Sequence, residues 1–230
     1  MGEIRVLSTH AVEEVMRDLA PQFTCASGHR LSFHYDPANV LKRNIEHGAA
    51  FDVAIVTRSV IDDLAGQGRI LRETCCDVAR SGLGVAVRQG AAKPDIATTD
   101  AFKHALRAAR SVVRSAEGTS GVYFATMLKR LGIAEAMNGK IVLGPSGRVA
   151  ALVARGEAEL AVQQIPELLA VDGVDFAGPF PAALQLYTVF STGVGRAAAD
   201  RAVAKTFVDA LTAPSAAALF RAKGLEPVLR

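Results

Sequence analysis

The chain has 230 residues, half of them hydrophobic and 21% charged, with 26 Lys and Arg against 23 Asp and Glu. This composition is too apolar for a disordered chain and fits one or two compact domains. The longest apolar runs are far shorter than the roughly 18 residues of a membrane span. The small basic excess lacks the clustered stripe of a nucleic-acid surface. We therefore expect no membrane insertion and no nucleic-acid partner.

The first third of the chain alternates short apolar runs with amphipathic segments. The apolar runs predict strands at residues 4–7, 31–35 and 52–56. The segments between them predict helices over residues 11–19, 37–48 and 57–66. Because proline lacks a backbone N–H, Pro21 is expected to end the first helix. Asp36, followed by Pro37, is expected to be the N-cap of the second helix.

The same alternation continues to the end of the chain. Further strands are predicted at residues 82–87, 112–113, 141–143, 160–162 and 184–190. Further helices are predicted at residues 99–110, 118–131, 145–155, 197–211 and 215–222. Repeated β-α-β units indicate parallel sheets covered on both faces. The sequence therefore predicts an α/β fold of two doubly wound lobes. Since no Pro/Ser-rich linker is present, strands must join these lobes, and residues 81–88 and 186–193 are the candidates.

Small or polar residues stand at several predicted strand-to-helix turns. These turns are residues 8–11, 36–39, 57–59, 117–121 and 144–147. In parallel α/β sheets such turns gather at the carboxyl edge, where ligands bind. Each helix start offers unpaired N–H groups and a partial positive charge, which suit an oxyanion or a carboxylate. The alternative is that these residues serve only as caps and turn formers.

Other motifs point away from cofactors and metals. No Gly-x-Gly-x-x-Gly follows the first strand and no phosphate-binding loop occurs, so we expect no nucleotide cofactor. His29 and His34 lack partners at metal-ligand spacing, so we expect no metal. The three cysteines include the adjacent pair Cys75 and Cys76, which is a poor disulfide framework and favours a reducing compartment. As written, the sequence shows no signal peptide, so we expect a cytoplasmic protein, or a periplasmic one if a leader was removed.

Several segments, taken in their order along the chain, resemble a known family. They are residues 4–6, "RNIEHGAAFDVAIVTRSVIDDLAGQGRI", "SGVYFATMLKRLGIAE", "ALVARGEAELAVQQIPEL" and "FVDALTAPSAAALFRAKGLEP". This order resembles the type II periplasmic-binding-protein-like (solute-binding) family, nearest its molybdate-binding-protein-like members. The resemblance implies two α/β lobes, joined by two crossing strands, that close on a small ligand. Lobe 1 would comprise residues 1–82 and 191–230, and lobe 2 residues 83–190.

The resemblance also implies where a ligand would bind. Molybdate binders look to use one serine hydroxyl in each of two first-lobe turns. Here the first position falls at Ala11, beside Thr9 and His10, and the second at residues 38–39, within "YDPAN". A hydroxyl is therefore missing or moved, and Asp36 stands beside the expected anion. These departures predict a small organic acid rather than molybdate or tungstate.

The candidate ligand-binding residues combine donors and acceptors that suit such an acid. They are Thr9, His10, Tyr35, Asn39, Arg80, Thr119, Ser120, Ser146 and Gln164. Within the resemblance, Thr119 and Ser120 match the second-lobe loop, and Gln164 takes the place of a ligand-facing tyrosine. Arg80 and Arg114 have the guanidinium geometry that fits a carboxylate. The alternative is that each arginine is a surface charge.

Two functional hypotheses follow. The first is a binder of a small anionic or polar metabolite in an interlobe cleft: a solute-binding protein, with a membrane transporter as partner if exported, or a cytoplasmic carrier or sensor. The second is a cytoplasmic enzyme on the same scaffold, in which His10 and Asp36 form a proton-transfer pair for an isomerase or tautomerase. The structural alternative is that Asp36 only caps its helix and that His10 only makes a local hydrogen bond.

Overall fold

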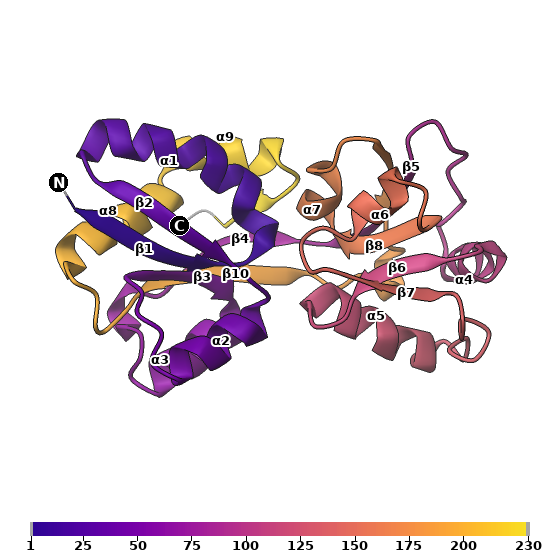
Figure 1. Cartoon of the computed structure of the whole chain (residues 1–230), viewed down its shortest axis with the longest axis horizontal. Coiled ribbons are helices and arrows are strands. Elements are labelled where there is room, and N and C mark those ends of the chain that lie inside the picture. The colour runs from indigo at the N-terminus through magenta and orange to yellow at the C-terminus, as the bar shows by residue number, and fades with distance from the viewer. Residues whose placement is uncertain (1, 229–230) are drawn as a thin grey trace. The chain divides into compact units, whose positions relative to one another are not determined.

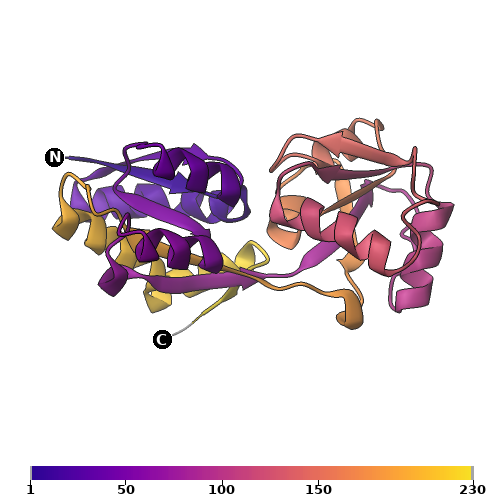
Figure 2. The same ribbon diagram turned by 90° about the horizontal axis from the view of Figure 1, so that it is seen from below.

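A computed structural model describes residues 2–228 and divides the chain into two compact units. Unit 1 is formed by the chain up to Arg80 and from Thr188 onward, and unit 2 by Ser81–Tyr187. Each unit consists of a mixed β-sheet with helices on both faces, which confirms the predicted α/β fold class (Figure 1). The chain passes between the units twice, after β4 and before β10, which are neighbouring strands of unit 1 (Figure 2).

The sheet of unit 1 has the strand order β11-β4-β10-β3-β1-β2. Its strands are β1 (Glu3–Ser8), β2 (Arg30–Tyr35), β3 (Val53–Thr57), β4 (Cys76–Ser81), β10 (Thr188–Val194) and β11 (Glu226–Pro227). Strand β1 pairs in parallel with both β2 and β3, whereas β10 runs antiparallel to β3. All five residues of β3 are buried, since neighbouring strands and helices cover it on every side.

Helices cover both faces of this sheet. They are α1 (Glu13–Ser27), which follows the short 3-10 turn η1 (His10–Val12), α2 (Ala38–Glu46), α3 (Arg58–Gly66), α8 (Arg201–Thr212) and α9 (Pro214–Ala222). Helices α1, α8 and α9 pack on one face around Phe207 and Phe220. Helices α2 and α3 pack on the other face around Leu41 and Leu64. A second 3-10 turn, η2 (Arg72–Thr74), precedes β4.

Unit 2 has a five-stranded sheet with the order β7-β6-β8-β5-β9. Its strands are β5 (Leu83–Arg88), β6 (Val112–Ser115), β7 (Ile141–Gly144), β8 (Leu160–Gln164) and β9 (Val174–Pro179). Its helices are α4 (Thr99–Ala108), α5 (Thr119–Arg130), α6 (Ala150–Ala154), α7 (Ile165–Leu169) and the 3-10 turn η3 (Ala182–Leu184). Phe102 and Phe124 anchor α4 and α5 on one face, and Val153 and Leu168 anchor α6 and α7 on the other.

The two sheets share one connectivity. In unit 1 the chain runs β1-α1-β2-α2-β3 and places β1 between β2 and β3. In unit 2 it runs β6-α5-β7-α6-β8 and places β6 between β7 and β8. In each case the connections leave the central strand in opposite directions. The resulting switch points, beside the carboxyl ends of β1 and β6, are where open α/β sheets bind ligands.

Three local expectations were wrong. Helix α1 continues through Pro21 to Ser27, because Phe23 extends its buried face; it ends where Gly28 adopts a left-handed conformation with φ of 72°. The N-cap of α2 is Pro37 rather than Asp36, and no side chain caps this helix. The predicted strand over residues 184–190 begins only at Thr188, after the turn η3.

Candidate functional site

The switch point of unit 1 contains a buried hydroxyl. Thr9 follows β1 directly, and its backbone N–H donates to the carbonyl of Ile55 on β3 over 3.0 Å. The residue is 7% exposed, and its Oγ1 has no hydrogen-bond partner among the described residues. Since buried polar atoms in native proteins are nearly always paired, this unmet hydroxyl suits the oxygen of a ligand.

Next to Thr9, His10 forms part of a polar and aromatic cluster. Its Nδ1 lies 3.0 Å from Oε2 of Glu13, and the two side chains are 17% and 23% exposed. The imidazole stacks on the ring of Tyr35, with centroids 5.9 Å apart, and Tyr35 stacks in turn on Phe33. Burial, aided by the Glu13 carboxylate, raises the pKa of Tyr35, so its hydroxyl stays protonated and can donate. The cluster combines a flat apolar surface with groups that can carry a proton.

The expected pair of His10 and Asp36 is not the pair that the structure shows. Oδ2 of Asp36 lies 3.3 Å from Nε2 of His34, while His10 contacts Glu13. Asn39 is exposed in the first turn of α2. Arg80 forms an exposed ion pair with Glu226, with its Nη2 2.7 Å from Oε2, which favours the surface-charge interpretation of this arginine.

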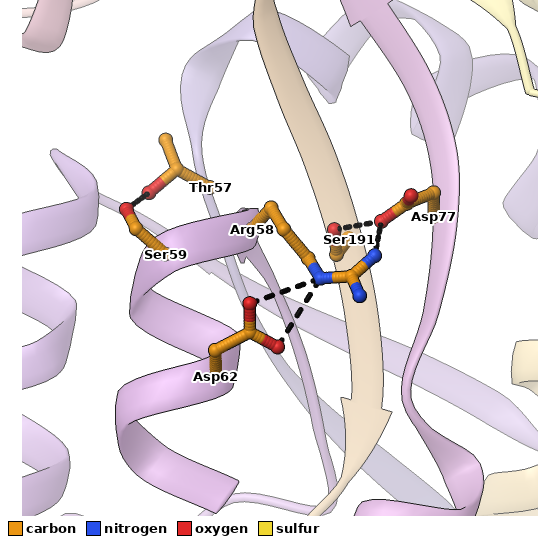
Figure 3. Close-up of polar contacts among 6 residues, drawn as sticks. All are labelled: Thr57, Arg58, Ser59, Asp62, Asp77 and Ser191. Carbon is orange, nitrogen blue, oxygen red and sulfur yellow. Dashed lines mark hydrogen bonds and ion pairs between the residues drawn. The ribbon is translucent and has the colours of Figure 1, made fainter.

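The third turn at this edge joins β3 to α3. Thr57 is buried, and its Oγ1 lies 3.4 Å from Oγ of Ser59. The Arg58 side chain points away from these hydroxyls, towards β4 and β10 (Figure 3). There its Nη1 donates to Oδ1 of Asp77 over 2.7 Å, and its Nε donates to both carboxylate oxygens of Asp62 over 3.1 Å.

The Arg58 ion pairs fix the start of α3. Oδ1 of Asp77 also accepts a 2.6 Å hydrogen bond from the buried Ser191 hydroxyl on β10 (Figure 3). The hydrogen bonds to Asp77 and Asp62 raise the pKa of Arg58. Because two carboxylates neutralise this guanidinium, it connects α3 to the sheet instead of facing a ligand as a free cation.

The switch point of unit 2 also contains a buried hydroxyl, from Ser115 at the end of β6. Ser115 is 2% exposed, and its Oγ has no hydrogen-bond partner among the described residues. A β-carbon on Gly118, the N-cap of α5, would collide with this Oγ, and one on Gly121 would collide with the Ser115 carbonyl. The two glycines therefore let the first turn of α5 approach Ser115 closely. The Ser115 hydroxyl therefore lies beside the N-terminus of α5, a 12-residue helix whose first backbone N–H groups have no partner within the helix.

The candidate residues of unit 2 gather around the same edge. Thr119 and Ser120 begin α5, with Thr119 exposed and Ser120 3% exposed. Oγ of Ser146, in the turn after β7, lies 3.9 Å from the place of a Gly118 β-carbon. Gln164 ends β8 and is 4% exposed. The structure thus brings the predicted turn residues together at the carboxyl ends of the parallel strands.

Arg114, on β6, lies beside this turn. Its Nη1 donates to the carbonyls of Ser115 and Gly121 over 2.9 and 3.2 Å. No carboxylate of the described chain forms an ion pair with it, and burial lowers the pKa of its guanidinium. A half-buried cation thus contacts the backbone of Ser115 and the first turn of α5.

The remaining surface offers less chemistry. A pocket of about 980 Å³ in unit 2 lies between α4 and the amino ends of β6 and β8, near Ser111 and Leu160, and none of the candidate residues lines it. Within residues 2–228 no cluster of side chains could hold a metal ion. No helix in that range is long and apolar enough to cross a bilayer.

Two residues of these sites were not predicted from the sequence. Glu13 stands three positions after His10, a spacing that places two side chains on one helical face and so could have indicated the pair. Ser115 ends a strand shortly before a glycine-rich helix start. Nothing in the sequence shows that its hydroxyl lacks a partner, because that depends on how closely α5 packs.

Two α/β units with mixed sheets, between which the chain passes twice, match the type II periplasmic-binding-protein fold. The chain belongs to the bacterial extracellular solute-binding protein family, whose model matches residues 4–226.

Individual relatives cover nearly the whole chain. It is 32% identical over 231 residues to "Aconitate isomerase" of a Pseudomonas species, spanning 98% of this chain and 88% of the relative. It is 26% identical to "Molybdate-binding protein ModA" of Escherichia coli K12, spanning 97% of this chain and 88% of the relative. The periplasmic molybdate-binding protein of Azotobacter vinelandii has the same fold, with a TM-score of 0.82, 22% identity and 99% of both chains covered.

Proposed function

We propose that this chain binds a small organic acid through the polar groups at the carboxyl edges of its two sheets. The observation that carries the proposal is the pair of buried hydroxyls, Thr9 Oγ1 and Ser115 Oγ, at equivalent places in the two units. Neither has a hydrogen-bond partner within residues 2–228. An unmet buried hydroxyl costs about 1–3 kcal/mol. Acceptor oxygens of a ligand would supply the missing hydrogen bonds.

Two features favour an organic acid over a tetrahedral oxyanion. The stacked rings of His10 and Tyr35 suit contact with a carbon skeleton. The guanidinium of Arg114, with no acidic partner in the described chain, suits a planar carboxylate. The relative named as an aconitate isomerase, at 32% identity, points in the same direction.

A melting-shift screen of the intact chain tests this proposal. The probes are trans-aconitate, cis-aconitate, citrate, molybdate and sulfate. A ligand that binds only the folded state raises the melting temperature with concentration, by mass action. We expect the carboxylates to raise it and the two inorganic anions to have little effect. A shift with molybdate and none with any carboxylate would contradict the proposal.

A second candidate function, isomerisation by proton transfer, is favoured by the contact between His10 and Glu13. The Glu13 carboxylate 3.0 Å from Nδ1 favours the tautomer that carries its proton on Nδ1. Nε2 is then free to accept a proton from a substrate. A carboxylate that orients an imidazole in this way is a common arrangement for a general base.

The proposed step needs no redox partner. Nε2 of His10 removes a proton from a carbon next to a carboxylate, and the electron pair of the broken C–H bond delocalises over an adjacent C=C bond. The imidazolium then returns a proton to the far carbon of that three-carbon unit, and the double bond moves. Substrate and product have the same formula, and His10 ends in its starting state.

Isomerisation in deuterated buffer tests this second function. We expect the chain to interconvert cis- and trans-aconitate and to incorporate deuterium at carbon, because the proton on Nε2 exchanges with solvent. His10→Asn should abolish both reactions, while His104→Asn, which alters an exposed histidine of α4, should keep them. Binding without turnover by the unaltered chain would contradict isomerisation and leave the role of a solute-binding protein, with a transporter as its partner if exported.

A further inference from the structure

We propose that Arg114 binds a carboxylate group of the ligand directly and so restricts unit 2 to carboxylates. This inference rests on the proposed organic-acid function and names the group that unit 2 recognises. The position of the guanidinium, the acidic partner it lacks in the described chain and the buried Ser115 hydroxyl of the same turn point to this role.

The position of Arg114 is fixed by the backbone of the α5 turn. Nη1 is held between the carbonyls of Ser115 and Gly121, at 2.9 and 3.2 Å. These two bonds occupy one of the three nitrogens. Nε and Nη2 make no hydrogen bond or ion pair within the described chain, so donors of the planar fork remain available.

Two exposed arginines of unit 2, Arg110 and Arg155, are paired with acidic side chains. Arg110 lies 3.1 Å from a carboxylate oxygen of Glu159, and Arg155 contacts Glu157 at 2.5 Å. Both are more exposed than Arg114. Burying the Arg114 guanidinium without a counter-ion costs free energy, because the loss of hydration of a charge is offset only by a close opposite charge. An anionic ligand would supply that opposite charge.

The neighbouring groups would complete an anion site. Ser115 is 2% exposed, and its Oγ has no partner in the described part of the chain. It lies at the first turn of α5, where a helix leaves backbone N–H groups unpaired. Because Gly118 has no side chain, the backbone at the start of α5 lies close to that hydroxyl. A carboxylate placed there would accept from Ser115 with one oxygen and from the guanidinium of Arg114 with the other.

A structural role for Arg114 makes a different prediction. If its only task were to brace the two carbonyls, a neutral donor of similar reach would replace it. Arg114→Gln keeps an N–H donor and removes the charge and the fork. Arg114→Lys keeps the charge and removes the fork. Arg130→Gln is the matched control, because Arg130 is exposed at the opposite end of α5.

The experiment pairs these variants with ligands that each lack one carboxylate. The probes are trans-aconitate, with three carboxylates, and glutaconate, itaconate and mesaconate, which lack its central, first and last carboxylate respectively. Calorimetric titration to saturation gives the dissociation constant of each pair. The melting temperature of each unliganded variant shows that it is folded.

We expect Arg114→Gln to weaken trans-aconitate binding by about 10- to 100-fold, the usual loss for a hydrogen bond to a charged group. Arg114→Lys should lose less, and Arg130→Gln should bind as the unaltered chain does. For one dicarboxylate the Arg114→Gln loss should vanish, because that probe lacks the contacted group. Equal losses on all four probes, or none on any, would overturn direct contact while leaving the organic-acid function standing. If the unaltered chain binds none of the four, both proposals fail.

Discussion

Oε2 of Glu13 lies 3.0 Å from Nδ1 of His10, three residues earlier in the chain. If His10 is the proton-transferring group, Glu13 is its positioning residue. We predict that Glu13→Gln lowers kcat of aconitate isomerisation by about tenfold or more and leaves KM nearly unchanged, because general acid–base groups contribute about 10²- to 10⁴-fold. Steady-state kinetics of both directions would measure this.

The adjacent residue provides the control for this prediction. Glu14 pairs with Arg17 rather than with His10, so Glu14→Gln removes the same charge from the same turn and should leave kcat unchanged. Glu13→Asp should recover part of the lost rate. Equal effects of Glu13→Gln and Glu14→Gln would show that only the net charge of α1 matters.

The unpartnered hydroxyls of Thr9 and Ser115 predict opposite changes in stability and binding. Thr9→Val and Ser115→Ala each remove a buried polar atom that has no partner in the described structure, so each should raise the free energy of unfolding of the unliganded chain by about 1 kcal/mol. Each should also weaken organic-acid binding by about tenfold, since a ligand hydrogen bond is lost. Urea unfolding and calorimetry measure the two effects.

Thr192 separates the two effects. Its Oγ1 is also buried and has no hydrogen-bond partner among residues 2–228, but Thr192 lies inside β10, opposite Ile55 of β3. Thr192→Val should therefore stabilise the chain and leave ligand affinity unchanged. If Thr192→Val weakens binding as much as Thr9→Val does, the hydroxyl of Thr9 is not a ligand contact.

A methyl group on Gly118 is predicted to block the anion site of unit 2. The φ of Gly118 is −66°, which alanine adopts freely, so the backbone conformation should be kept. The added carbon would compete for the space of Ser115 Oγ, and we expect Gly118→Ala to weaken binding by about tenfold or more. Gly66→Ala is the control, because no atom lies within 4 Å of its new carbon. Binding unchanged by Gly118→Ala would remove this turn from the site.

The buried carboxylate of Asp52 predicts how stability changes with pH. It accepts hydrogen bonds from the backbone and side chain of Arg5 and from the Ala199 N–H, at 2.8 to 3.2 Å. Burial alone would raise the pKa of Asp52, but these hydrogen bonds outweigh it and hold the pKa below its ordinary value. The unfolded chain therefore binds a proton at a higher pH than the folded chain, and stability falls as pH falls through the folded pKa.

Asp52→Asn should remove this pH dependence. We expect it to cost about 2–3 kcal/mol near neutral pH, because hydrogen bonds to a charged group are lost. The difference from the unaltered chain should shrink below about pH 4, the ordinary carboxyl pKa. Urea unfolding between pH 3 and 7 measures it, and a difference that stays constant over this range would contradict the assignment.

The sequence predicted those helices and strands whose formation depends on the residues of the segment itself. The apolar, β-branched run of β3 predicted a buried strand because no other structure covers such a run on both faces. The prediction that Pro21 ends the first helix was wrong, because Phe23 packs into a core formed with α8 and α9 and keeps the chain helical beyond the proline. Strand β9 was missed, since its residues are only half-buried and end in Gly178 and Pro179.

For the candidate site, the sequence predicted the positions of turns but not the contacts between side chains. The turns that contain Ser120 and Ser146 lie at one edge of the sheet, because parallel strands place their carboxyl ends together. The partners of titratable groups were not predictable. Asp36 meets His34 and His10 meets Glu13 through side-chain directions that only the folded chain sets.

Unit 2 is one uninterrupted stretch of polypeptide, Ser81–Tyr187, whereas unit 1 needs both ends of the chain. Strand β10, which pairs with β3 in the middle of the unit 1 sheet, emerges from the ribosome only after all of unit 2. All of unit 2 has thus been synthesised, and can fold, before strand β10 of unit 1 is available. During synthesis the inserted unit is complete first, and the N-terminal strands spend that interval with an open sheet edge.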